Sequence, residues 1–142
     1  DTSADFVPDL LKYRPYLIKP NDEELAEWFG LINPSLEEIK DCGQKLLEKG
    51  AENVLVSLGE KGAILFTPTE TIHVTAPKGE VVNTACAGDT LLATFVGSQL
   101  LGLSNEEALI KAVAAGSSTA FRPGLTDFSD VPTLMQQIKR IL

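Results

Sequence analysis

The sequence has few of the residues from which metal centres and disulfides are built. It holds one histidine, His73, and two cysteines, Cys42 and Cys86, which are far apart and belong to no Cys-x-x-Cys pair. A structural zinc site needs about four clustered ligands, so these residues exclude one. Isolated cysteines of this kind are typical of reduced, buried or half-buried thiols in a cytoplasmic protein, and we expect that location.

Basic residues and long apolar runs are also scarce. The chain has 12 Lys and Arg against 20 Asp and Glu, a net charge of -8. Because binding to nucleic-acid phosphates requires a concentrated basic face, this balance predicts no nucleic-acid partner. No apolar run approaches the ~20 residues of a membrane-spanning helix, so we expect no membrane partner either. The 142 residues are 44% hydrophobic, which suits one globular domain.

Apolar runs and helical patterns alternate along the chain. The expected strands are residues 16–18, 53–58, 63–66 and 71–75. The expected helices are residues 7–11, 21–30, 35–50, 88–101, 104–121 and 131–142. This alternation predicts an α/β domain over residues 1–142, with an open, mostly parallel sheet covered by helices on both faces.

Several helices have clear start signals. Ser35 with Glu38 and Ser104 with Glu107 form the spacing of a capping box, in which each side chain binds the other residue's backbone N–H. The helix after Ser35 is expected to turn four apolar residues inward. These are Leu36, Ile39, Leu46 and Leu47.

The most informative stretch is VVNTACAGDT, residues 81–90. Small residues there allow backbone N–H groups to converge at a helix N-terminus, where the free amides and the helix dipole favour an anion. An aspartate beside such a site, Asp89, is unexpected unless it acts as a base, because like charges repel. The alternative is that Asp89 only caps the helix, a role that aspartate fills well. The residues alone leave both open.

Two further stretches carry a functional and a structural interpretation each. SLGEKG, residues 57–62, is either a hairpin turn with glycines at positive φ or a loop that lets a nucleotide approach the backbone. KPNDEE, residues 19–24, is either a third capping box, formed by Asn21 and Glu24, or a polar cluster at the edge where open α/β sheets bind ligands.

Together, the three stretches resemble the C-terminal half of ribokinase-like sugar kinases of the phosphofructokinase B type. CAGD, residues 86–89, stands where that family has G-A-G-D, and Asn83-Thr84 resembles the polar pair before it. SLGEKG is similar to the family's S-L-G-x-x-G nucleotide loop, and NDEE, residues 21–24, to its N-x-x-E motif for magnesium and phosphate. The resemblance covers nearly all of the chain. It implies that an N-terminal half with the sugar pocket and lid is missing, so that this fragment alone is inactive.

The K-P-N-x-x-E form and the small-residue helix Ala112–Ala120 look most like the 1-phosphofructokinase branch, with tagatose-6-phosphate kinases next. The resemblance therefore implies ATP-dependent conversion of fructose 1-phosphate to fructose 1,6-bisphosphate, and a possible homodimer of the full-length protein. It implies that Asp89 is the base and that the N–H groups of Ala87, Gly88 and Asp89 form the anion hole.

The resemblance also implies the ligand-binding residues. The implied ATP contacts are Lys19, Asn21, Ser57, Leu58, Gly59, Glu60, Lys61, Gly62 and Gly88. Glu24 would act on Mg²⁺ through water. A monovalent cation such as K⁺ would bind near Asn83, Ala85, Arg122 and Gly124.

One departure from the motif is Cys86, which replaces the first glycine. A β-carbon there narrows the anion hole or conflicts with a positive φ, so we expect tolerated or reduced activity. The competing hypothesis is a non-catalytic nucleotide-binding module on the same fold. The retained Asp89 argues against it, and Cys86 argues for it.

Overall fold

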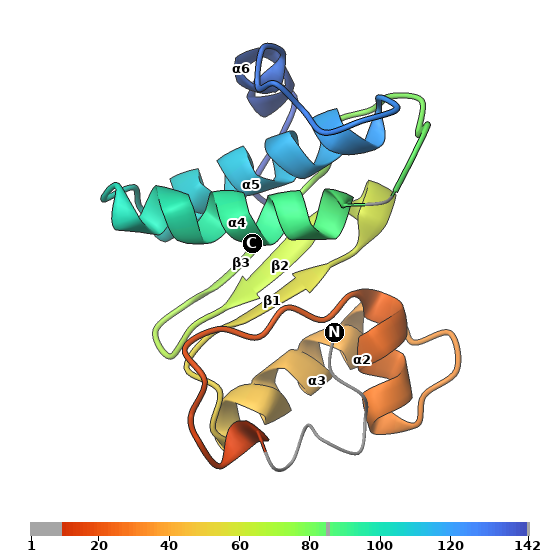
Figure 1. Ribbon diagram of the computed structural model, residues 1–142. Coiled ribbons are helices and arrows are strands. Elements are labelled where there is room, and N and C mark those ends of the chain that lie inside the picture. Colours follow the sequence, from red (N-terminus) through yellow and green to blue (C-terminus); the bar gives the residue numbers. More distant parts are fainter. Residues whose placement is uncertain (1–9, 85, 142) are drawn as a thin grey trace. The chain divides into compact units, whose positions relative to one another are not determined.

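The structure is a computed structural model that describes residues 10–84 and 86–141. The chain forms two compact units, Asp1–Leu58 with Ile64–Thr71 and Gly59–Ala63 with Ile72–Leu142. Figure 1 shows the elements of both. No helix among the described residues is long and apolar enough to cross a membrane. Most of the helix expected at residues 7–11 lies outside the described residues.

In the first unit, local signals define helices α2 and α3. Helix α2 (Asp22–Phe29) begins after Asn21 and ends at Gly30, which adopts the left-handed conformation with φ 66°. Helix α3 (Leu36–Lys49) begins after Ser35 and ends at Gly50. Asn21 and Ser35 both form the reciprocal bonds of a capping box, so these two predicted helix starts are confirmed.

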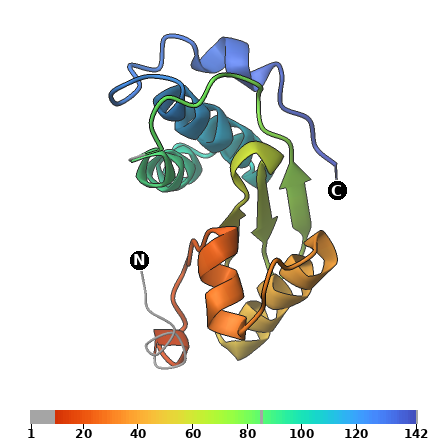
Figure 2. The ribbon, with the colours of Figure 1, turned by 90° about the vertical axis from the view of Figure 1, so that its right-hand side faces the viewer.

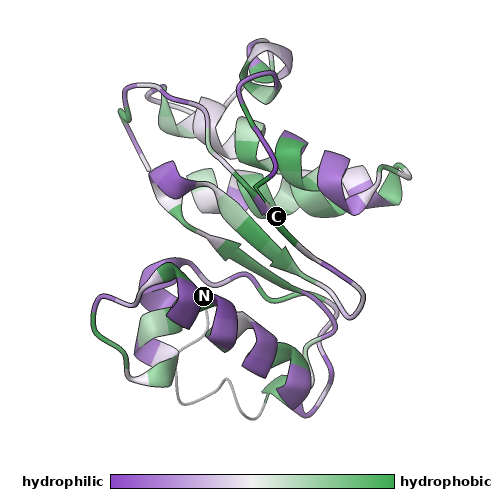
Figure 3. Cartoon of the chain, turned by 180° about the vertical axis from the view of Figure 1, so that it is seen from behind, coloured by the Kyte–Doolittle hydropathy of each residue, from purple (hydrophilic) through white to green (hydrophobic). Residues whose placement is uncertain are grey.

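The core of the first unit forms where α3 packs on the strands. Gly43 allows this approach, because a Cβ on it would overlap the ring of Phe66. Ile39 and Leu46 are buried as predicted, whereas Leu36 is 40% exposed because it lies in the first turn. Figure 3 shows the outer face of α3 as hydrophilic and the strands as hydrophobic.

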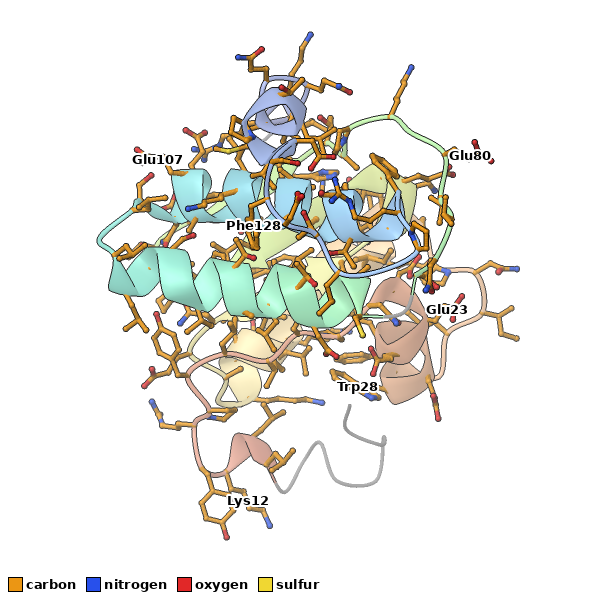
Figure 4. All side chains as sticks on the ribbon, turned by 45° about the horizontal axis from the view of Figure 1, so that its top comes forward. Lys12, Glu23, Trp28, Glu80, Glu107 and Phe128 are labelled. Atoms are coloured by element: carbon orange, nitrogen blue, oxygen red, sulfur yellow. The ribbon has the colours of Figure 1, made fainter. Side chains whose placement is uncertain are left out.

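Glu23 and Trp28, the two residues of helix α2 that are labelled in Figure 4, extend from different sides of the helix. Trp28 packs against the core of the first unit, together with the buried Leu25. Glu23, in the acidic first turn, is exposed. Helix α2 therefore turns Leu25 and Trp28 toward the core of the first unit and Glu23 toward solvent.

The sheet has the strand order β1 (Val54–Ser57), β2 (Ala63–Phe66) and β3 (Thr71–Val74). These three strands form a small antiparallel sheet. The run at residues 16–18 is not a strand of its own, since it contributes one isolated parallel bridge, from Ile18 to Val54. A second parallel bridge joins Asn21 to Ser57. Among the described residues, parallel pairing is confined to these two bridges.

The described part of the second unit contains three α-helices. Helices α4 (Ala87–Leu100) and α5 (Asn105–Ala120) lie side by side (Figure 1, Figure 2). Their close approach depends on small residues of α5, since a Cβ on Gly116 would come within 3.1 Å of the Ala87 carbonyl oxygen. The side chain of Ser104 caps α5 by accepting from the N–H of Glu107.

The C-terminal helix is much shorter than predicted. Helix α6 covers only Val131–Met135, and the expectation of a helix over residues 131–142 is wrong. Beyond it, Arg140 forms an antiparallel bridge with Val74, and the N–H of Ile141 donates to the carbonyl of His73. Pairing with the edge of β3 satisfies backbone groups that a longer helix would have satisfied internally.

Candidate active site

In the first unit, the predicted ligand residues lie at the start of α2. The Asn21 side-chain oxygen accepts from the Glu24 N–H at 2.7 Å, and Glu24 Oε1 accepts from the Asn21 N–H at 3.1 Å. The capping-box interpretation of this stretch is therefore correct. Capping uses the single side-chain oxygen of Asn21 and one of the two Glu24 oxygens, so it does not exclude a ligand role for the Asn21 side-chain NH2 group or the other Glu24 oxygen.

Backbone pairing brings this stretch to the start of the glycine loop. The N–H of Ser57 donates to the carbonyl of Pro20 at 3.1 Å, next to the Asn21–Ser57 bridge. Lys19 is half-buried just before these contacts. The first unit thus brings residues from two of the three predicted motifs together at the C-terminal end of β1.

The donors at α2 suit a magnesium ion that is shared with phosphate and water. Within residues 10–84 and 86–141, no group of three or more His, Cys, Asp or Glu side chains is placed to hold a metal. Mg²⁺ commonly binds through one or two carboxylates, substrate phosphates and several waters. The Glu24 oxygen that the capping box does not use fits that donor set.

The glycine loop belongs to the second unit from Gly59 onward, and its two glycines differ. Residues Gly59–Lys61 form one 3-10 turn, and both Gly59 and Gly62 have positive φ, 59° and 94°. A Cβ on Gly62 would overlap the Val74 carbonyl oxygen, so the fold itself requires that glycine. A Cβ on Gly59 would meet no described atom within 4 Å. The backbone at Gly59 is therefore open to a ligand.

The third motif lies at the N-terminus of α4. The N-cap is Cys86, whose side chain forms no capping hydrogen bond with the described residues. Asp89 is the third residue of the helix and is exposed. The interpretation of Asp89 as the N-cap is therefore wrong. Its place in the first turn still stabilises the helix through the dipole.

The backbone of Cys86 is left-handed, with φ 66° and ψ -4°. The predicted conflict between a β-carbon and a positive φ is thus present in this chain. For a residue other than glycine, this conformation costs roughly 1–2 kcal/mol. Cys86 therefore needs support from its surroundings.

The amides expected to form an anion hole follow Cys86. The N–H of Ala87 donates to the Thr84 carbonyl at 3.2 Å. Gly88 and Asp89 occupy the next helical positions, where N–H groups generally have no acceptor within a helix. An anion at this N-terminus would accept first from the amides of Gly88 and Asp89. The Ala87 N–H could bind the anion only by giving up its hydrogen bond to the Thr84 carbonyl.

The residues implied for a monovalent cation are partly brought together. The N–H of Asn83 donates to the Ala120 carbonyl at 3.1 Å, and its side-chain amide donates to the Pro123 carbonyl at 3.4 Å. Asn83 thus lies beside the loop that contains Arg122 and Gly124, whereas Ala85 lies outside the described residues.

The Arg122 side chain forms ion pairs within the loop and, being positively charged, is not a ligand for a cation. Its guanidinium pairs with Asp127 and Asp130, at 3.1 Å each. Hydrogen bonds from the Ser129 hydroxyl and N–H, followed by Arg122, lower the pKa of Asp127 to about 2. Backbone carbonyls of this loop are the better candidates for cation ligands.

Sequence reasoning missed a cluster of hydroxyl groups at the end of α5. The Ser118 hydroxyl lies 2.6 Å from the Thr126 hydroxyl and also donates to Asp130. The Thr119 hydroxyl accepts from the Thr126 N–H and donates to the Thr90 hydroxyl, both at 3.2 Å. The available signal was three adjacent hydroxyl residues, Ser117, Ser118 and Thr119, in the small, apolar second half of the helix.

Comparison with known proteins identifies the family. The sequence profile of pfkB family carbohydrate kinases matches residues 1–133. The chain belongs to this family. It is 52% identical over 140 residues to D-tagatose-1-phosphate kinase of Bacillus licheniformis, covering 98% of this chain and 46% of that protein. It is 39% identical over 139 residues to 1-phosphofructokinase of Bacillus subtilis, again covering 98% and 46%. The chain spans about half the length of these curated relatives.

Solved structures confirm the ribokinase-like α/β fold. Phosphofructokinase-2 of Escherichia coli, in complex with potassium, matches with a TM-score of 0.84 and 26% identity, covering 94% of this chain and 45% of that one. Arabidopsis thaliana ribokinase, complexed with ribose and ATP, matches with a TM-score of 0.76 and 34% identity, covering 85% and 41%.

Proposed function

We propose that the full-length protein containing this chain is an ATP-dependent kinase of a ketohexose 1-phosphate, with fructose 1-phosphate as substrate and fructose 1,6-bisphosphate as product. The observation that carries the proposal is the N-terminus of α4, where Asp89 stands in the first turn beside helix amides without being the N-cap. A carboxylate placed next to an anion-binding N-terminus suits a base that must reach a hydroxyl at the phosphate.

In the proposed reaction, the C6 hydroxyl oxygen attacks the γ-phosphorus of ATP. A new O–P bond forms, the bond from the γ-phosphorus to the β–γ bridging oxygen breaks, and ADP leaves. Asp89 accepts the proton of the attacking hydroxyl. The amides of Gly88 and Asp89, joined by that of Ala87, stabilise the charge on the transferring phosphoryl group, which is the main requirement of such transfers.

The other motif residues would bind the nucleotide. Lys19 and Asn21 would contact its phosphates, and Glu24 would hold magnesium through water. When bound, magnesium neutralises charge on the phosphates. Ser57 and the loop through Gly62 would border the nucleotide, with Gly59 as its closest backbone. A monovalent cation would bind between Asn83 and the loop of residues 122–124.

A second candidate substrate is tagatose 1-phosphate. The 52% identity to a D-tagatose-1-phosphate kinase supports it. It replaces the tagatose 6-phosphate that the motifs alone suggested. Both 1-phosphates carry a primary C6 hydroxyl and differ only in configuration at C4, so the proposed roles of Asp89 and the amides are the same for each.

The test is ADP release by the full-length protein with ATP, Mg²⁺ and a panel of sugar phosphates. We expect turnover with fructose 1-phosphate or tagatose 1-phosphate and little with fructose 6-phosphate, whose C6 oxygen is already esterified. Release that does not rise above the sugar-free rate with any of these would refute the kinase proposal and favour the non-catalytic nucleotide-binding module.

A further inference from the structure

We propose that Thr90 is a positioning residue, whose hydroxyl holds the left-handed Cys86 peptide and thereby aims the amides of the anion hole. The inference rests on the proposed function. It assigns a role to Thr90, which ends the stretch of residues 81–90 without a function of its own there, and to Thr119 and Thr126, which lie outside all three stretches.

The three threonines form a chain of hydrogen bonds that ends at Cys86. The Thr126 N–H donates to the Thr119 hydroxyl at 3.2 Å, and that hydroxyl donates to the Thr90 hydroxyl at 3.2 Å. The Thr90 hydroxyl then donates to the Cys86 carbonyl at 2.9 Å. We call this series the threonine chain.

The direction of the threonine chain is set by its two ends. A backbone N–H can only donate, and a carbonyl can only accept. Each hydroxyl has one proton to donate. The Thr119 hydroxyl therefore donates its hydrogen bond to the Thr90 hydroxyl, and the Thr90 hydroxyl donates to the Cys86 carbonyl. Within this series of bonds, the Thr90 hydroxyl proton therefore has one acceptor, the Cys86 carbonyl.

Holding this carbonyl also fixes the next amide. The carbonyl of Cys86 and the N–H of Ala87 belong to one planar peptide unit and point in opposite directions. The Thr90 N–H donates to the same carbonyl at 2.9 Å. Two bonds from Thr90 therefore set the orientation of the peptide from which the proposed anion hole begins.

Cys86 makes this hold necessary. A residue other than glycine in the left-handed region relaxes toward negative φ when released, whereas glycine adopts either sign with little penalty. A threonine hydroxyl that bonds back to the carbonyl four residues earlier is common in helices. Here that carbonyl belongs to a strained N-cap, and the hydroxyl is anchored by Thr119, which is buried at 1% exposure.

The test uses four variants of the full-length protein, assayed for turnover of the active sugar phosphate. Thr90→Val removes the hydroxyl and keeps the shape, whereas Thr90→Ser keeps the hydroxyl. The third variant combines Thr90→Val with Cys86→Gly. Thr94→Val, one turn further along α4, makes the same chemical change away from Cys86 and is the matched control.

We expect Thr90→Val to lower kcat about tenfold, the worth of one hydrogen bond, with KM for ATP within about twofold. Thr90→Ser should regain most of the loss, and Thr94→Val should match the parent. Cys86→Gly should restore most of the kcat lost in Thr90→Val, because glycine needs no hold. If the Thr90 hydroxyl had only a structural role, Thr90→Val would lower Tm, and adding Cys86→Gly would not restore the lost kcat. Parental kcat in Thr90→Val, or an equal loss with and without Cys86→Gly, would overturn the inference.

A second measurement does not depend on kinase activity. If the parent fails to turn over any sugar phosphate, the proposed function fails, and hydrogen exchange at the two bonded amides of this turn, those of Ala87 and Thr90, then tests the hold alone. Exchange there should be about tenfold faster in Thr90→Val than in Thr90→Ser. Equal exchange in the two variants would refute the role of Thr90.

Discussion

Asp89→Asn in the full-length protein separates a catalytic aspartate from a structural one. Because Cys86 is the N-cap, Asp89 contributes to α4 only through its charge in the first turn. That interaction is worth about 0.3–1 kcal/mol at an exposed position, so Asp89→Asn should lower Tm by only a few degrees. Asparagine retains the size of the side chain but cannot accept the hydroxyl proton.

A positioned general base contributes about 10²–10⁴ in rate, so kcat should fall by that factor in Asp89→Asn. ATP affinity should stay within a few fold, since the lost charge repels phosphate rather than binding it. The assay is steady-state ADP release, with ATP binding measured by calorimetry. Asp89→Ala is the control, because it removes the same charge and should lower kcat equally. An Asp89→Asn enzyme that works at near-parental rate would refute the catalytic assignment.

Four further predictions follow from the structure. Gly59→Val should weaken ATP binding, measured by calorimetry, because its side chain would occupy the open space beside the loop. Lys61→Ala should change ATP binding little, because the loop is expected to contact the nucleotide mostly through its backbone and the Lys61 side chain is exposed. Equal affinity in both variants would contradict the loop assignment. Gly62→Ala should lower Tm strongly in thermal unfolding, since its Cβ would overlap the Val74 carbonyl oxygen. These 142 residues alone span about half the length of the curated relatives, and we expect them to release no ADP above the sugar-free rate with any sugar phosphate, because an acceptor that is not held in place is not positioned for attack. NMR titration of Asp127 should give a pKa of about 2, and Ser129→Ala should raise it toward the ordinary 3.8. Because the folded pKa is lowered, any stability from Asp127 is present above pH 3.8 and is lost as pH falls through about 2.

Locally encoded elements were predictable from the sequence, and elements decided by distant contacts were not. Capping residues and terminal glycines gave the bounds of α2 and α3 because these signals act within a few residues. The helix expected at residues 131–142 was too long because the bridge between Arg140 and Val74 competes with its amphipathic pattern. The run at residues 16–18 has a strand-like composition, yet only Ile18 pairs with a neighbour.

The candidate site shows the same division. The three motifs were recognisable because each concentrates glycine, small or acidic residues in a short stretch. The threonine chain was not, since it joins residues from α4, α5 and the loop after α5 that meet only when the helices pack. For Asn21 and Glu24, the structural alternative does not exclude the functional one, because the capping box leaves the Asn21 side-chain NH2 group and the second Glu24 oxygen unused.

The magnitudes at Cys86 explain how a residue other than glycine can hold a left-handed backbone at the start of α4. The left-handed conformation costs roughly 1–2 kcal/mol for cysteine, and one intramolecular hydrogen bond contributes about 0.5–1.5 kcal/mol. The two bonds from Thr90 to the Cys86 carbonyl, both at 2.9 Å, are therefore of the right size to offset that cost. The cysteine does not by itself favour the non-catalytic alternative, because Cys86 adopts the left-handed conformation that a glycine would allow at this position. With cysteine at position 86, the orientation of the peptide between Cys86 and Ala87 depends on the two hydrogen bonds from Thr90. With glycine there, that dependence would be weaker.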